Sequence, residues 1–296
     1  MTALALALLA LVLLWPAPLL LARARWTYRE PRAALVLWQA IGLAAGLALI
    51  GAAVAVALAP LGGGLFDGLA ALARGTGRLP TAHTVLFLVA LGLLTWLAGV
   101  LVYRFLATLW VRRRHRELLD LVADPWPGQA GGRVLAHPRA VAYCLPGAGS
   151  RVVLSSGALD LLDPQELDAV VAHERAHLAE RHDLVVLPFA AWRTALPGLP
   201  GVRRARPAVA TLVEMLADDR ACAVCDRAAL ATALARVGTA AAPEGALAAT
   251  GRATLVRVQR LLDPPAPSPV LRFGCYAGAA ALLAVPTLAL LAGWSG

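Results

Sequence analysis

The sequence lacks the cysteine and aromatic patterns that several classes of binding protein need. Of its four cysteines only Cys222 and Cys225 form a CxxC pair, and the second pair that a zinc ribbon requires is absent. No aromatic residues alternate with the basic ones, so despite a net charge of +9 we expect no direct nucleic-acid binding. Cys222 and Cys225 are expected to pack on one helix, with a redox or metal-site role as the alternative.

Charged residues are also scarce, at 15% of the chain, whereas 59% of the 296 residues are apolar. Four apolar runs with almost no charge are each long enough to cross about 30 Å of hydrocarbon as a helix. The chain is therefore predicted to be an integral membrane protein. The predicted spans are residues 1–22, 33–60, 83–104 and 272–293.

The predicted spans contain few polar residues. Gln39, Thr95 and Arg104 are too sparse to line an ion route, which argues against a transporter. The first run has no charged segment before it, and its arginines follow it, which is the reverse of an export signal. We therefore expect it to be retained as a span rather than cleaved.

Arginine supplies every basic residue, and its distribution predicts how the chain crosses the membrane. Arginines cluster in the first loop, 23–32, and directly after the third span, whereas the loop 61–82 has only Arg74 and Arg78. By the positive-inside rule, the first loop and the segment 105–271 are cytoplasmic and both termini are extracytoplasmic. The expected location is the plasma membrane, with the lipid bilayer as a partner.

Residues 105–271 contain no apolar run of spanning length, so they are predicted to be a folded domain, which at about 160 residues can bury its own core. The stretch Asp163-Pro164-Gln165-Glu166 is typical of a helix start: an acidic N-cap, proline at the first position and glutamate three residues after the cap. We predict a helix from about Pro164 to about Arg181.

This helix carries an HExxH motif, His173-Glu174-Arg175-Ala176-His177. Residues four apart share one helix face, so the two imidazoles can bind a single ion. In such motifs the histidines bind zinc and the glutamate takes a proton from water as the general base. The alternative is a solvated helix with two surface histidines.

A third metal ligand is expected from a second helix that opens near Pro207. Its residues Glu214 and Asp218 are also four apart, so Glu214 could complete a three-ligand catalytic site while Asp218 hydrogen-bonds a ligand histidine. An exposed acidic helix face is the alternative. No HxxGxxH extension follows His177, and His182 is expected to be a surface residue.

Two short strands, about 140–145 and 151–155, are predicted around a Pro-Gly-Ala-Gly turn. A strand edge beside the metal-binding helix would let an extended peptide substrate pair with it. The alternative is an ordinary hairpin that covers the core. Tyr143, Arg252 and Arg257 are candidates for stabilising a developing oxyanion. The amphipathic segment that carries both arginines could lie on the inner leaflet or pack against the domain.

These motifs resemble the membrane-embedded gluzincin metallopeptidases, over roughly Val134 to Arg227. Two related branches are similar: the HtpX and CaaX-protease type, and the BlaR/MecR type. The arrangement of three spans before the domain and one after it favours the BlaR/MecR type. The resemblance implies one zinc ion per chain, with His173, His177 and Glu214 as ligands. It implies that Glu174 is the general base and that the carboxylate of Asp218 hydrogen-bonds a ligand histidine.

The expected fold is therefore a mostly α integral membrane protein of four transmembrane helices with a cytoplasmic α+β gluzincin zinc-peptidase domain that contains a small β-hairpin or sheet. The expected function is a zinc metalloendopeptidase that cleaves a protein substrate, by resemblance a small DNA-binding repressor. BlaR/MecR sensors carry a penicillin-binding domain after the last span, which this sequence does not include, so direct β-lactam sensing is not expected. The alternatives are HtpX-like quality control of membrane proteins and a non-catalytic signalling scaffold.

Overall fold

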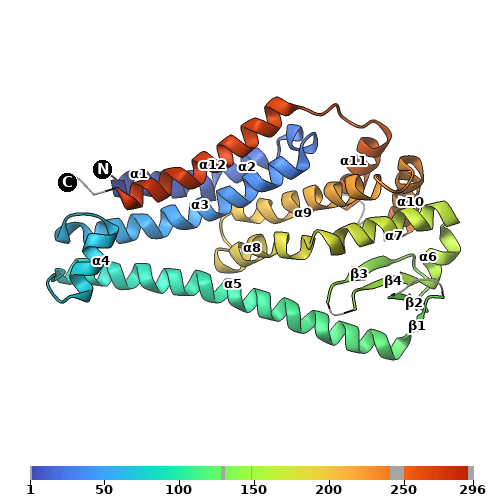
Figure 1. The fold of residues 1–296 in the computed structure, drawn as a ribbon, viewed down its shortest axis with the longest axis horizontal. Helices are drawn as coiled ribbons and strands as arrows, with labels where there is room; N and C mark the ends of the chain where they lie inside the picture. Colours follow the sequence, from blue (N-terminus) through green and yellow to red (C-terminus); the bar gives the residue numbers. More distant parts are fainter. Residues whose placement is uncertain (1, 128–130, 148, 241–249, 293–296) are drawn as a thin grey trace. The chain divides into compact units, whose positions relative to one another are not determined.

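The computed structural model describes residues 2–127, 131–147, 149–240 and 250–292, and it is largely helical with one small sheet (Figure 1). The described residues fall into two compact units. The first is drawn from residues 1–104, 187–209 and 268–296, and the second from residues 105–186 and 210–267. The candidate site lies in the second unit.

The first unit contains long apolar helices. They are α1 (Thr2–Leu14) with α2 (Pro16–Leu21), α3 (Pro31–Leu58), the first part of α5 (Thr81–Val122), and α12 (Pro269–Leu291). In the described part of the chain, four segments are long and apolar enough to cross a membrane: Thr2–Leu21, Pro31–Leu61, Thr81–Val122 and Pro269–Leu291. These agree with the four apolar spans predicted from the sequence, although α5 continues to Val122.

Small residues let these helices pack closely. Both α1 and α12 run along α3, whose buried face is rich in alanine, including Ala34, Ala44 and Ala48 (Figure 1). By contrast, α5 exposes large apolar side chains such as Leu88 (59% exposed) and Trp96 (55%). Apolar side chains exposed along a helix of this length are suited to lipid, so the helices indicate a membrane protein.

Two features of the first unit lie outside the four spans. The loop predicted at 61–82 contains a short helix, α4 (Leu65–Ala73), which the sequence analysis did not predict. Glu30, at the N-cap of α3, accepts hydrogen bonds from the backbone N–H of Ser268 at 2.8 Å and from Nε of Arg272 at 3.0 Å. This contact ties the start of α3 to the start of α12.

The second unit contains a four-stranded sheet in the order β1-β2-β4-β3, formed by β1 (Ala123–Pro125), β2 (Gly132–Leu135), β3 (Ala142–Leu145) and β4 (Arg151–Ser155). Strands β3 and β4 are antiparallel, which confirms the predicted hairpin. The strands β1 and β2 were not predicted. Both strands are short. Tryptophan and proline follow β1, and glycine precedes β2. The sheet leaves β3 at an edge.

Helix α7 (Pro164–Ala179) begins as the sequence predicts. The Asp163 carboxylate accepts from the Glu166 N–H at 2.9 Å, and the Glu166 carboxylate accepts from the Asp163 N–H at 3.0 Å, which completes a capping box. The helix packs on the sheet through Val170 and Val171, in one core cluster with Leu154 of β4. This packing fixes the helix face that carries the two histidines.

The other helices of this unit are α6 (Ser156–Leu161), α10 (Arg227–Ala240) and α11 (Thr250–Leu262), with the second part of α5, part of α8 (His182–Ala195) and part of α9 (Pro200–Ala221). The prediction that a helix opens near Pro207 is wrong. Because α9 begins at Pro200, Pro207 lies inside it. Helix α11 packs against the domain, where Leu261 joins a core cluster with Ala169 and Ala221.

Candidate metal centre

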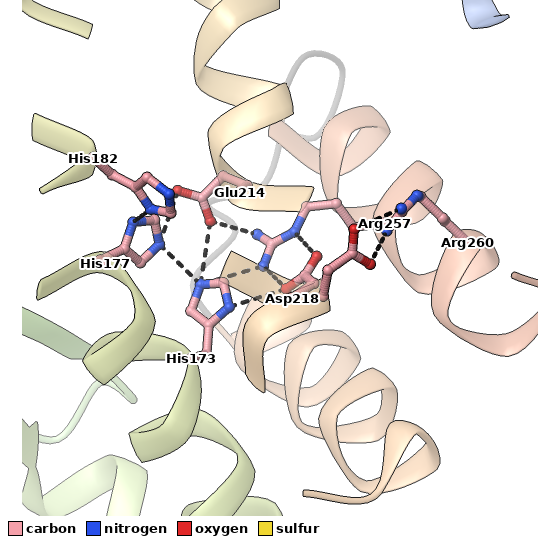
Figure 2. A network of polar contacts seen from close by, with 8 residues as sticks. His173, His177, His182, Glu214, Asp218, Arg257 and Arg260 are labelled. Atoms are coloured by element: carbon pink, nitrogen blue, oxygen red, sulfur yellow. Dashed lines mark hydrogen bonds and ion pairs between the residues drawn. The ribbon is translucent and has the colours of Figure 1, made fainter. Parts of the chain in front are cut away.

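Three predicted ligands converge in the second unit (Figure 2). His173 and His177 lie one turn apart on α7, and their Nε2 atoms are 3.1 Å apart. Glu214 of α9 faces both rings: its Oε2 lies 3.4 Å from Nε2 of His173, and its Oε1 lies 3.6 Å from Nε2 of His177. The spacing of four residues in the HExxH motif therefore places both imidazoles around one point with a carboxylate opposite.

These separations fit a zinc ion. Zinc–ligand bonds of about 2.0–2.1 Å at tetrahedral angles place two ligand atoms about 3.3 Å apart. The two Nε2 atoms here are 3.1 Å apart, and each lies 3.4 or 3.6 Å from one of the two carboxylate oxygens of Glu214. Two imidazoles and one carboxylate are also the donor set of catalytic zinc sites that keep one position open. The residues thus fit a zinc ion on geometry and on donor chemistry.

Asp218 supports His173 from behind. It lies one turn after Glu214 on α9, is almost fully buried, and places Oδ1 at 3.0 Å from Nδ1 of His173. Burial disfavours the Asp218 carboxylate ion, but contacts with Arg257 and His173 outweigh it, and its pKa is lowered. The anion can therefore hold the Nδ1–H of His173 and leave Nε2 for a metal.

Arg257 of α11 connects both acidic residues, a role that the sequence analysis did not assign. Figure 2 shows its guanidinium between Glu214 and Asp218, and it is buried. Burial opposes ionisation of Glu214, but its contacts with His173, His177 and Arg257 hold its pKa well below the usual range. Since α9 and α11 are far apart in sequence, no spacing rule could have found this contact.

Glu174 is half-buried on α7 and lies beside β3. Burial, and then the negative charge of Glu174, raise the pKa of Cys144 on that strand to about 12, so the thiol stays protonated. A cavity of about 300 Å³ beside the site is lined by Cys144, His177 and Glu214 among others.

The prediction that His182 is a surface residue is wrong. It is 3% exposed, and its Nδ1 lies 3.0 Å from Nδ1 of His177 (Figure 2). The prediction assumed that α7 continues to Arg181, but the helix ends at Ala179 and Arg181 adopts a positive φ of 49°. This turn places His182 against the candidate ligand His177. Burial and then the neighbouring His177 lower the pKa of His182.

The oxyanion candidates fall in three different places. The hydroxyl of Tyr143 lies 3.0 Å from Nε2 of His115 on α5, because alternate residues of a strand face opposite sides and Cys144 takes the side of α7. Arg252 is exposed. Arg257 reaches the site, where it contacts the two acidic residues, and its Nη2 also lies 3.5 Å from Nε2 of His173.

Cys222 and Cys225 both follow the end of α9 at Ala221 rather than lying on one helix. Both pack in the core cluster around Ala169 and Leu230, and neither forms a disulfide. Burial raises the pKa of both thiols, that of Cys222 to about 11. The packing role predicted for the pair agrees with this environment.

Comparisons with known proteins identify relatives of the part of the chain that contains this centre. Residues 106–224 match Peptidase family M48, which indicates a metallopeptidase domain in this part of the chain. The peptidases of that family are zinc metalloproteases. The match covers both helices that carry the candidate ligands, but not Arg257 of α11.

Two curated proteins are similar to short parts of the chain. A protein named protease HtpX homolog from Aeropyrum pernix is 41% identical over 83 residues, in an alignment that covers 24% of this chain and 26% of that protein. Another protease HtpX homolog, from Thermoplasma acidophilum, is 46% identical over 44 residues, 15% of this chain and 14% of that protein. The chain thus spans about a quarter or less of the curated relatives that it matches. No solved structure matches it.

Proposed function

We propose that the protein is an integral-membrane zinc metalloendopeptidase of the HtpX type. The single observation that carries this proposal is the convergence of His173, His177 and Glu214 at separations suited to one zinc ion. The M48 match and the four apolar helices support the same conclusion. One zinc per chain is the proposed cofactor.

The mechanism assigns each residue a task. When bound, zinc supplies a Lewis acid that polarises the scissile carbonyl and makes the attacking water more acidic. Glu174 takes the proton from that water and delivers it to the leaving amine. Asp218 holds His173 in the tautomer that leaves Nε2 free, and Arg257 holds Asp218 and Glu214 in place.

The edge of β3 offers a peptide substrate a strand with which to pair. The N–H of Ser155 donates to the carbonyl of Val141 at 2.9 Å, and hydrogen-bonded pairs alternate along an antiparallel ladder. Tyr143 therefore pairs with Val153 on β4, whereas the backbone groups of Ala142 and Cys144 point away from β4. A substrate paired there would lie beside α7, the helix that carries Glu174 and packs against β3.

The arginine distribution supports a cytoplasmic peptidase domain and extracytoplasmic termini. In that orientation the enzyme would cleave proteins at the cytoplasmic face of the membrane. The sequence similarity to HtpX homologs favours membrane-protein quality control as its role.

A second candidate role is regulatory cleavage of a small DNA-binding repressor. The order of three apolar helices before the domain and one after it favours this role, because it is similar to the BlaR/MecR arrangement. A repressor gene beside the gene for this chain would support it, and a purified repressor from such a pair would be the substrate to test.

The experiment compares the full-length chain with a Glu174→Gln variant in detergent. Hydrolysis of an unstructured protein such as casein is followed together with bound zinc. We expect cleavage by the wild type and its loss in Glu174→Gln, with zinc content equal in both. Equal cleavage by both would contradict the assignment of Glu174, and a zinc-loaded wild type that cleaves no peptide bond would favour the scaffold alternative.

A further inference from the structure

His182 contacts the metal centre from a position that the HExxH motif does not include. It is the first residue of α8, and its Nδ1 lies 3.0 Å from Nδ1 of His177. The residue is 3% exposed, and its buried Nε2 makes no hydrogen bond to any residue that the structure describes. On the far side, Nε2 lies 3.5 Å from Oε2 of Glu180. The ring thus lies between a candidate ligand and a carboxylate.

The tautomers of the two rings follow from this geometry. An imidazole that binds a metal through Nε2 carries its hydrogen on Nδ1. The Nδ1–H of His177 would then point at Nδ1 of His182, which must accept the hydrogen bond. The hydrogen of a neutral His182 is consequently on Nε2, which lies 3.5 Å from Oε2 of Glu180.

We propose that His182 is a positioning residue of the metal centre, which fixes the tautomer and ring orientation of His177 by accepting its Nδ1–H. Asp218 does the same for His173 from the other side of the site. Both ligand histidines would then be held from behind, one by a carboxylate and the other by a histidine. This proposal rests on the zinc centre of the proposed function and not on the reaction.

A buried histidine could also serve the fold through packing alone, and the two roles respond differently to substitution. Asparagine and leucine have similar size and shape, but only asparagine carries an oxygen near the position of Nδ1. His182→Asn therefore keeps an acceptor for His177, whereas His182→Leu removes it. A packing role predicts that leucine is tolerated at least as well as asparagine, and a positioning role predicts the reverse.

The test measures zinc affinity by competition with a chromophoric chelator, on metal-free full-length protein in detergent. The samples are wild type, His182→Leu, His182→Asn, and His137→Leu as a control at an exposed histidine. Removing a group that orients a metal ligand costs about 10–100-fold in affinity. We expect a loss of that size in His182→Leu, a markedly smaller loss in His182→Asn, and no change in the control.

Visible absorption of the Co²⁺-substituted proteins gives a second readout, because the ligand-field bands report ligand geometry. We expect altered bands in His182→Leu and wild-type-like bands in His182→Asn. If His182→Leu does not fold, as judged by circular dichroism of the metal-free protein, His182→Gln takes its place. The same order is expected there, because the longer glutamine side chain carries its amide near the position of Nε2 rather than that of Nδ1.

The outcomes separate this proposal from the function on which it rests. Wild-type affinity in His182→Leu, or equal losses in His182→Leu and His182→Asn, would overturn the positioning role while leaving the zinc centre intact. A wild-type chain that binds no zinc would instead overturn the centre itself.

Discussion

Arg257 forms two parallel hydrogen bonds with Asp218, from Nε to Oδ2 at 2.8 Å and from Nη2 to Oδ1 at 2.7 Å. Its third nitrogen, Nη1, lies 2.9 Å from Oε2 of Glu214. One buried guanidinium on α11 therefore holds both carboxylates of α9 in the orientation that the two histidines require. A planar guanidinium is suited to such bidentate contacts, and a lysine ammonium is not.

Replacing Arg257 should destabilise the domain. Removing one partner of a buried ion pair leaves an uncompensated charge, at a cost of about 3–5 kcal/mol in the free energy of unfolding. We expect Arg257→Ala to lower the melting temperature of the metal-free protein strongly, and Arg257→Lys to lower it less. Arg252→Ala, at an exposed position of the same helix, is the control. Equal melting temperatures in Arg257→Ala and Arg252→Ala would contradict the account.

Zinc binding should release a proton from His173. Burial disfavours its charged ring, but contacts with Asp218 and Glu214 outweigh this and raise its pKa to about 9. Near neutral pH the metal-free ring is therefore protonated, and a metal ligand must be neutral. We expect about one proton released per zinc from this ring, and affinity that increases with pH up to about 9.

Titration calorimetry in buffers of different ionisation enthalpy measures this release directly. In Asp218→Asn the release should be smaller, because the anion that stabilises the charged ring is gone. Binding heats that do not vary with the buffer would show that His173 is already neutral in the metal-free protein.

We expect substrate binding to require the backbone N–H and C=O groups at the free edge of β3. Cys144→Pro removes an N–H that points away from β4, whereas Cys144→Ala removes only the thiol. Proline is tolerated on edge strands because no ladder hydrogen bond is lost there. We expect Cys144→Pro to raise KM for a peptide substrate and Cys144→Ala to keep it near the wild-type value. The reverse order would assign the thiol, not the strand, to substrate binding.

Cys222 and Cys225 should not be needed for the metal. Because burial raises the pKa of both thiols, they are protonated at neutral pH and react slowly with alkylating reagents. The double variant Cys222→Ser/Cys225→Ser is expected to keep the zinc content of the wild type. Loss of zinc in this variant would revive the metal-site role that a CxxC pair allows.

The parts that the sequence could predict are those set by local spacing. The capping box at Asp163 and the pairs of residues four apart on two helices follow from helix geometry alone, and each is present as predicted. Whether the two pairs come together depends on how α7 and α9 pack, and the composition of the domain does not specify that packing. The four apolar spans followed from length and hydropathy.

The parts that could not be predicted depend on where the chain turns. His182 was misplaced because nothing in the sequence indicates that Arg181 leaves the helical conformation. Arg257 is 39 residues from its partner Asp218, beyond the reach of any periodicity argument. Tyr143 faces away from the site because the register of a short strand decides its side, and one residue of shift would reverse it.

The most direct test of the zinc centre is the amount of metal bound per chain, measured by mass spectrometry on full-length protein purified in detergent. The samples are wild type, Glu174→Gln, Glu214→Leu and the exposed-site control His137→Leu. We predict about one zinc per chain in the wild type, in Glu174→Gln and in the control, and little in Glu214→Leu, because a three-ligand site loses its carboxylate. No zinc in the wild type, or equal zinc in Glu214→Leu, would contradict the assignment of this centre.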